Sequence, residues 1–302
     1  MTDTFAEPIN RPPPGRRAGN TEAPRPAWTA GKSSTGDGGG LAVCFVATAF
    51  ADAAAFGLSA GRGEGAATHA LDSARCAIDG KTHRFESDGH ILQALADFRD
   101  ALAKDPVLSD KVQFGVVDFS DDARDAIPLG DFTAADIEKH RLSARGGTSY
   151  AAAFTKMGEV IERDIAAGRS QFKYFRPAVY FLTDGYPNGG DGWQAAFAAL
   201  TEFDPASGHG NKSYPLFVPF GIGDADTAVL SQLVYPKDRS ALFMANAGTS
   251  PAEAIQKMAQ GMLKSMLASG QSAVTGRPQH ILPTQQEMGP GVSVYAGGDY
   301  VS

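Results

Sequence analysis

Two short segments carry the side chains with the clearest chemical potential in this chain. The first places the hydroxyl of Thr148 directly after Gly147 and just before a helical pattern. The second is the apolar run 178–182, after which the carboxylate of Asp184 opens an Asp-Gly turn. A hydroxyl and a carboxylate on neighbouring loops are oxygen donors that suit a hard cation such as Mg²⁺ or Mn²⁺.

The elements around these side chains predict where they lie. The run 178–182 is typical of a buried parallel strand, which would carry Asp184 to the carboxyl edge of a sheet, where open α/β folds bind ligands. The helix after Thr148 has one apolar stripe and is expected to end at Gly168. Gly147 lets the backbone approach a ligand closely. Taken singly, Thr148 is also a common helix N-cap and Asp184 a common turn residue.

Strands and helices alternate over residues 39–271. Residues 112–119 and 126–129 predict an antiparallel hairpin, and apolar residues recur at helical spacing over about 90–104 and 251–267. We therefore expect an α/β fold with a doubly wound, mostly parallel central sheet, helices on both faces and one antiparallel edge strand.

Three segments are expected to lie outside this core. Residues 1–38 are rich in proline and glycine and predict a disordered tail. Residues 52–88 form a long insertion after the first strand, which either contributes to binding or is inert. Residues 272–302 are expected to form a loosely structured C-terminal tail.

The Thr148 and Asp184 segments resemble the second and third motifs of a von Willebrand factor A domain, over roughly residues 40–270. In that family five side chains on three loops hold a divalent ion, and an acidic side chain of a partner protein completes its coordination. The resemblance implies a metal bridge between proteins rather than a catalyst. It makes Thr148 and Asp184 the remaining metal ligands. Candidate partner contacts are Gly147, Ser149, Tyr186, Pro187 and Asn188, although Pro-Asn-Gly-Gly is equally typical of an ordinary turn.

The first motif of this family, Asp-x-Ser-x-Ser, is expected where the first strand, residues 41–46, ends. Here the three ligand positions are Ala47, Ala49 and Ala51. One hydroxyl and one carboxylate are too few to strip water from Mg²⁺, so we expect metal binding to be weak or absent. Either natural loss of the motif or deliberate replacement of Asp, Ser and Ser would explain three alanines at these positions. We favour an engineered variant, because drift more often leaves mixed residues.

The Thr-Asp-Gly-x-Pro loop at residues 183–187 is most similar to the bacterial, tellurium-resistance-associated intracellular type of this domain. That resemblance implies an adaptor that works with an ATPase, kinase or phosphatase in stress response or defence. The alternative is a pseudo-site domain that never used metal and binds through its insertion.

Composition excludes several other functions. The formal net charge of −7 argues against sequence-independent binding of nucleic acid, which needs a basic face. Two cysteines make no disulfide framework, no signal peptide is visible, and Asp52 interrupts the longest apolar stretch. We expect a cytoplasmic protein that binds neither nucleic acid nor membrane.

An enzyme is the remaining alternative. Residues 57–61 match the G-x-S-x-G pattern of a hydrolase, with Ser59 as nucleophile and His209 or His280 as base. That motif needs a strand before the serine and a helix after it, and the residues around Ser59 favour neither. We therefore expect no enzymatic activity.

Overall fold

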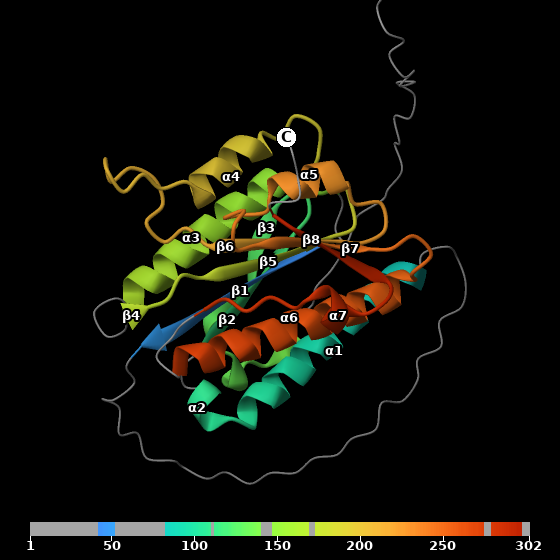
Figure 1. Ribbon diagram of the computed structural model, residues 1–302, viewed down its shortest axis with the longest axis horizontal. Helices are drawn as coiled ribbons and strands as arrows, with labels where there is room; N and C mark the ends of the chain where they lie inside the picture. Colours follow the sequence, from blue (N-terminus) through green and yellow to red (C-terminus); the bar gives the residue numbers. More distant parts are fainter. Residues whose placement is uncertain are drawn as a thin grey trace, which may run out of the picture. The chain divides into compact units, whose positions relative to one another are not determined.

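An eight-stranded sheet forms the centre of this protein (Figure 1). The computed structural model describes residues 42–51, 82–109, 112–139, 147–168, 173–274 and 279–297. The strand order is β3-β2-β1-β5-β6-β7-β8, and β4 pairs with β1. The strands are β1 (Ala42–Ala51), β2 (Val112–Phe119), β3 (Ala123–Asp131), β4 (Lys173–Tyr174), β5 (Ala178–Thr183), β6 (Leu216–Gly221), β7 (Ala241–Ala245) and β8 (Val292–Ala296).

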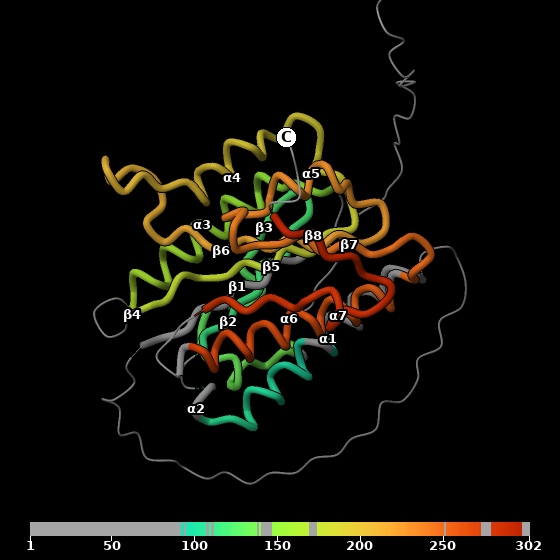
Figure 2. Tube along the Cα trace, in the orientation of Figure 1, coloured from blue at the N-terminus to red at the C-terminus, as the bar shows by residue number. Residues whose placement is uncertain are grey.

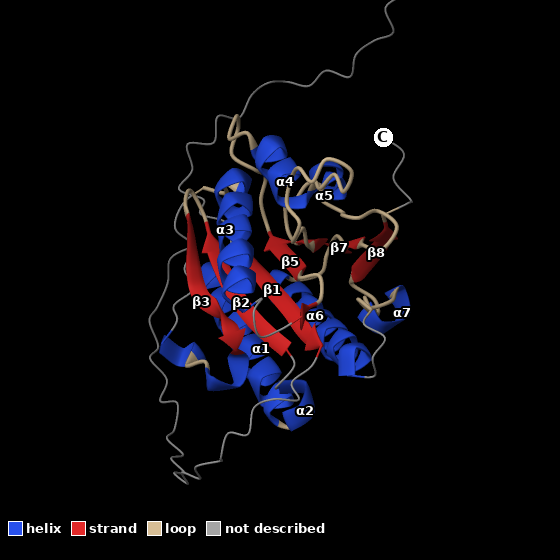
Figure 3. Ribbon diagram, turned by 90° about the vertical axis from the view of Figure 1, so that its left-hand side faces the viewer, coloured by secondary structure: helices blue, strands red, loops and turns tan. Residues whose placement is uncertain are grey.

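Helices cover both faces of the sheet, as predicted. Helices α3, α4 and α5 lie on one face, and α1, α6 and α7 lie on the other (Figure 1). Figure 3 shows α3 lying across β2 and β3. The helices are α1 (Thr82–Ala103), α2 (Pro106–Ser109), α3 (Tyr150–Gly168), α4 (Trp193–Thr201), α5 (Thr227–Gln232), α6 (Pro251–Val274) and α7 (Gln285–Met288), with short 3-10 helices at Phe132–Ala134 and Ile137–Lys139.

Side chains along β5 alternate between two layers of the hydrophobic core. Tyr180 and Leu182 belong to the cluster that includes α1 and α6, whereas Val179 and Phe181 pack with α3 and α4. All six residues of β5 are buried, because the strand has a neighbour on each side and helices on each face. Its parallel pairing with β6 confirms the predicted buried parallel strand.

Five of the eight strands point in one direction, namely β2, β4, β5, β6 and β7. Strand β3 is the predicted antiparallel edge strand. Two further strands, β1 and β8, are also reversed. Strand β8 is reversed at the opposite edge, and β1 runs antiparallel to both β2 and β5 in the middle of the sheet.

The C-terminal segment is part of the fold, so the predicted loose tail is wrong over residues 279–297. Met288 and Val292 are buried, and β8 pairs with β7 (Figure 2). The side chain of Gln285 donates from Nε2 to the Val292 carbonyl (2.8 Å) and accepts from the Val294 amide (2.8 Å). It thereby satisfies polar groups on the outer side of an edge strand.

The remaining domain predictions fall largely outside the described residues. These exclude residues 1–41, which contain the predicted tail, and residues 52–81 of the predicted insertion. The rest of that insertion belongs to α1, which begins at Thr82 rather than near His90. Within the described parts of the chain, no helix combines the length and apolar character needed to cross a membrane.

Candidate functional site

Polar loops gather where β2, β5 and β6 end. Because these three strands share one direction, the segments that follow them meet at one side of the sheet, together with the start of α3. We call this surface the carboxyl edge and define it as residues 120–122, 147–149, 184–192 and 222–226. It is the side of an open α/β sheet at which ligands bind.

Asn188 holds the loops of the carboxyl edge together. The Thr148 amide donates to Asn188 Oδ1 (2.8 Å), and the Asn188 amide donates back to the Thr148 carbonyl (2.9 Å). Asn188 Nδ2 also donates to Asp121 Oδ1 (3.2 Å). One side chain therefore links the loop before α3, the loop after β5 and the β2–β3 turn.

Gly147 packs closely against side chains of the protein itself. A Cβ at this position would overlap Asp121 Oδ1 and would lie 2.7 Å from Asn188 Oδ1. The N-cap of α3 is Ser149 rather than Thr148, because the Ser149 hydroxyl accepts a hydrogen bond from the Ala152 amide (3.2 Å). Sequence predicted that a ligand approaches the backbone at Gly147, and in the structure the side chains of Asn188 and Asp121 lie there instead.

Thr148 and Asp184 do lie on adjacent loops. Thr148 is buried, and a Cβ on Gly185 would lie 3.3 Å from its Oγ1. Asp184 is half-buried with its Oδ1 atom shielded from solvent, and Tyr150 donates its hydroxyl to the Gly185 carbonyl (3.0 Å). The structure therefore brings these two predicted site residues together.

Asp191 is a further residue of this edge that sequence reasoning missed. Its Oδ1 accepts from the Trp193 amide (3.1 Å), and its Oδ2 accepts from the Ala151 amide (3.3 Å) and the Ser149 hydroxyl (3.4 Å). One carboxylate thus serves the N-termini of both α3 and α4, where negative charge is stabilising. An aspartate two residues before a predicted helix was the available signal.

Tyr186 is the exposed residue of the loop after β5. Its side chain is 58% exposed, the largest fraction among the large hydrophobic residues that the structure describes. Pro187 next to it is half-buried, and Asn188 and Asp191 anchor the loop beyond it. The loop is therefore fixed while its aromatic side chain faces solvent.

The structure does not place Ala47, Ala49 and Ala51 at the carboxyl edge. Because β1 is antiparallel to β5, Ala42 lies opposite Thr183, and Ala47 lies opposite Ala178 at the start of β5. At the rise of a β-strand, five residues carry Ala47 roughly 17 Å from the Thr183 end. The backbone of Ala51 is farther still and pairs with β4. These positions are not beside Thr148 and Asp184, so their interpretation as missing ligands lacks structural support.

The residues present at the carboxyl edge do not fit a divalent cation. Within the described residues no group of three His, Cys, Asp or Glu side chains could hold a metal ion. Thr148 and Asp184 supply one hydroxyl and one carboxylate, whereas Mg²⁺ needs a larger set of oxygen ligands. The Asp191 carboxylate is already used by backbone amides.

The residues of the hydrolase alternative are not assembled at this edge. Ser59 lies outside the described residues. His209 is exposed in the loop between α4 and β6, and His280 contacts the Arg176 carbonyl before β5 (3.0 Å). Both histidines therefore lie toward the opposite side of the sheet.

A mixed sheet covered by helices on both faces, with polar loops at the ends of its parallel strands, defines an open α/β domain. The von Willebrand factor type A domain family matches residues 81–260, more than half of the chain, and the chain belongs to this family. Domains of this family generally mediate protein–protein interaction, often through a divalent metal. The match begins after β1 and so excludes Ala47, Ala49 and Ala51. No curated protein and no solved structure matches the chain.

Proposed function

We propose that this chain is a non-enzymatic module that binds a partner protein at its carboxyl edge, with Tyr186 as the anchor. The exposed side chain of Tyr186 on a fixed loop is the observation that carries this proposal. Tyrosine is among the residues that most often dominate binding energy at interfaces. Because Asn188 and Asp191 already fix the loop, little conformational entropy is lost on binding.

Binding without a metal is favoured over the metal bridge that the family resemblance implies. The oxygen donors at the carboxyl edge are too few for Mg²⁺ or Mn²⁺, and the position of β1 offers no alternative ligands. The proposal is thus closer to the pseudo-site alternative than to an engineered, metal-dead variant. It places binding on the Tyr186 loop rather than on the insertion.

The charge of the carboxyl edge indicates the partner's chemistry. Asp121, Asp122 and Asp224 are exposed, and the four segments of this edge contain no lysine or arginine. Without a metal to neutralise them, these carboxylates disfavour an acidic side chain from the partner. We propose a basic segment whose apolar part covers Tyr186. A cytoplasmic adaptor role in bacterial stress response, beside an ATPase, kinase or phosphatase, is proposed from the resemblance alone.

Affinity capture from a lysate of the source organism tests this function. We expect the wild-type chain to retain a specific protein that Tyr186→Ala loses, with the same result in EDTA. Tyr295→Ala is the matched control, because Tyr295 is also exposed but lies on β8. Retention by both variants, or loss in EDTA, would contradict metal-independent binding through Tyr186.

A further inference from the structure

A cluster of cationic and aromatic side chains lies on the opposite side of the sheet, where β5, β6 and β7 begin. We call it the amino-edge cluster and define it as Arg176, Tyr214, Tyr235, Arg239 and His280. Arg176, Tyr214 and Arg239 each lie two residues before a strand of the parallel part of the sheet. The cluster is therefore separate from the carboxyl edge.

Arg176 is held on an aromatic surface. Its Cζ atom lies 3.4 Å from the centroid of the Tyr214 ring, and its Nη1 donates to the Tyr214 carbonyl (2.8 Å). The Tyr214 ring packs edge-on against Tyr235, with 5.8 Å between centroids. A stacked guanidinium of this kind is oriented in advance and keeps further N–H donors for another acceptor.

The charge of Arg176 is not compensated by the part of the chain that the structure describes. Within those residues no carboxylate forms an ion pair with it. Burial lowers the pKa of Arg176 below its ordinary value, and the nearby charge of Arg239 acts in the same direction. A half-buried cation without a counter-ion is costly, which favours an anion from outside.

We propose that the amino-edge cluster binds an acidic segment of a partner protein, with one carboxylate on Arg176 and a second near Arg239. The planar guanidinium matches a carboxylate through two parallel hydrogen bonds. The flanking rings of Tyr214 and Tyr235 offer contact area of the kind that anchors protein interfaces. The formal net charge of −7 argues against nucleic acid as the ligand, since nucleic acid binds to extended basic surfaces.

Fluorescence anisotropy with a labelled, N-acetylated hexaglutamate peptide tests the proposal. We expect the full chain to bind this peptide in a salt-dependent manner, and Arg176→Gln to weaken binding at least about tenfold. Arg239→Gln should weaken peptide binding about threefold or more. Because the Arg239 side chain is exposed, this variant tests binding with less risk to folding than Arg176→Gln. Asp238→Asn should strengthen binding, because Asp238 competes for Arg239 at 3.5 Å.

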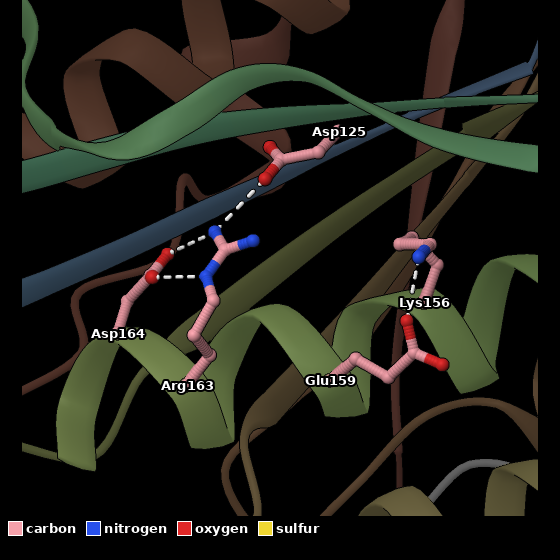
Figure 4. Close-up of polar contacts among 5 residues, drawn as sticks. All are labelled: Asp125, Lys156, Glu159, Arg163 and Asp164. Carbon is pink, nitrogen blue, oxygen red and sulfur yellow. Dashed lines mark hydrogen bonds and ion pairs between the residues drawn. The ribbon is translucent and has the colours of Figure 1, made fainter. Parts of the chain in front are cut away.

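Arg163 provides the matched control on the surface of α3. Its guanidinium already donates to Asp164 (2.5 and 2.8 Å) and to Asp125 (2.8 Å), as Figure 4 shows. Arg163→Gln should therefore leave peptide binding unchanged, and so should Tyr186→Ala at the carboxyl edge. The latter result separates this site from the proposed function.

Three outcomes would overturn the proposal. The first is no binding at millimolar peptide, or binding that Arg176→Gln and Arg239→Gln leave intact. The second is tighter binding of inorganic phosphate or of an oligouridylate, which would assign the cluster to phosphate or nucleic acid. The third is self-association of the wild-type chain in sedimentation that Arg176→Gln abolishes, which would make a second copy of the chain the occupant.

Discussion

At the scale of single residues, the carboxyl edge is built from side chains that bond to one another across loops. The Asn188 side chain bonds to the Thr148 amide and the Asp121 carboxylate, and the Asp191 carboxylate accepts from the Ala151 and Trp193 amides. Such interactions hold the loops of the edge in place. Thr148 and Asp184 could be found from sequence because they stand in recognisable motifs, whereas sequence marks Asp191 only as a residue near a helix start, and its bond to the Ala151 amide is made only on folding.

Gly147→Ala is expected to destabilise the protein by about 1–3 kcal/mol, because the added methyl group would overlap Asp121 and Asn188. Urea unfolding of wild type and variant measures this difference. Gly189→Ala in the same edge is the control, since a Cβ there meets nothing within 4 Å and its φ is not positive. Equal stability of the two variants would mean that the contacts of Asn188 do not confine Gly147.

At the scale of elements, the sequence specified much of the core. The apolar runs of β5 and β6 and the stripe of α3 were recognisable, because a strand buried on both faces is a continuous apolar run and a helix buried on one face repeats every three to four residues. The direction of β1 was not recognisable, since alternation with a period of two is the same in either orientation. Strand β8 was missed because its five residues follow a segment rich in proline and polar residues.

The direction of β1 makes a prediction about metal binding. The triple variant Ala47→Asp, Ala49→Ser, Ala51→Ser restores the family's first motif, yet its new ligands would start roughly 17 Å from the Thr183 end of β5. Calorimetric titration with Mg²⁺ and Mn²⁺ should therefore detect no binding to this variant or to the parent chain. Micromolar binding by the variant alone would show that β1 delivers these residues to Thr148 and Asp184, and that the parent is an ablated metal site.

At the scale of the whole molecule, the modest net charge conceals an uneven distribution. The carboxyl edge carries aspartates without a lysine or arginine, whereas the amino-edge cluster carries two arginines beside a histidine. The C-terminal segment packs on the amino-edge cluster, because His280 contacts the carbonyl of Arg176, two residues before β5, while β8 pairs with β7 in the same sheet. Protonation of that histidine is therefore coupled to global stability.

Acid should destabilise the protein through His280. Burial lowers the pKa of His280 to about 4, and the positive charges of Arg176 and Arg239 act in the same direction. A histidine in the unfolded chain has a pKa near 6.5, so the unfolded state binds more protons between these values. Stability is then complete above about pH 6.5 and falls by up to about 3 kcal/mol as the pH approaches 4.

Urea unfolding of the wild-type chain and His280→Gln, measured at intervals from pH 7 to pH 4, isolates this contribution. Glutamine keeps an N–H group for the Arg176 carbonyl but cannot gain a proton, so its free energy of unfolding should fall less steeply. Carboxylates that titrate in the same pH range change the free energy of unfolding of both proteins equally, so their contribution cancels when the two are subtracted. His209→Gln, at an exposed loop position, should follow the wild type. If wild type and His280→Gln instead decline in parallel, His280 is not buried against two positive charges, and the packing of the C-terminal segment on Arg176 is incorrect.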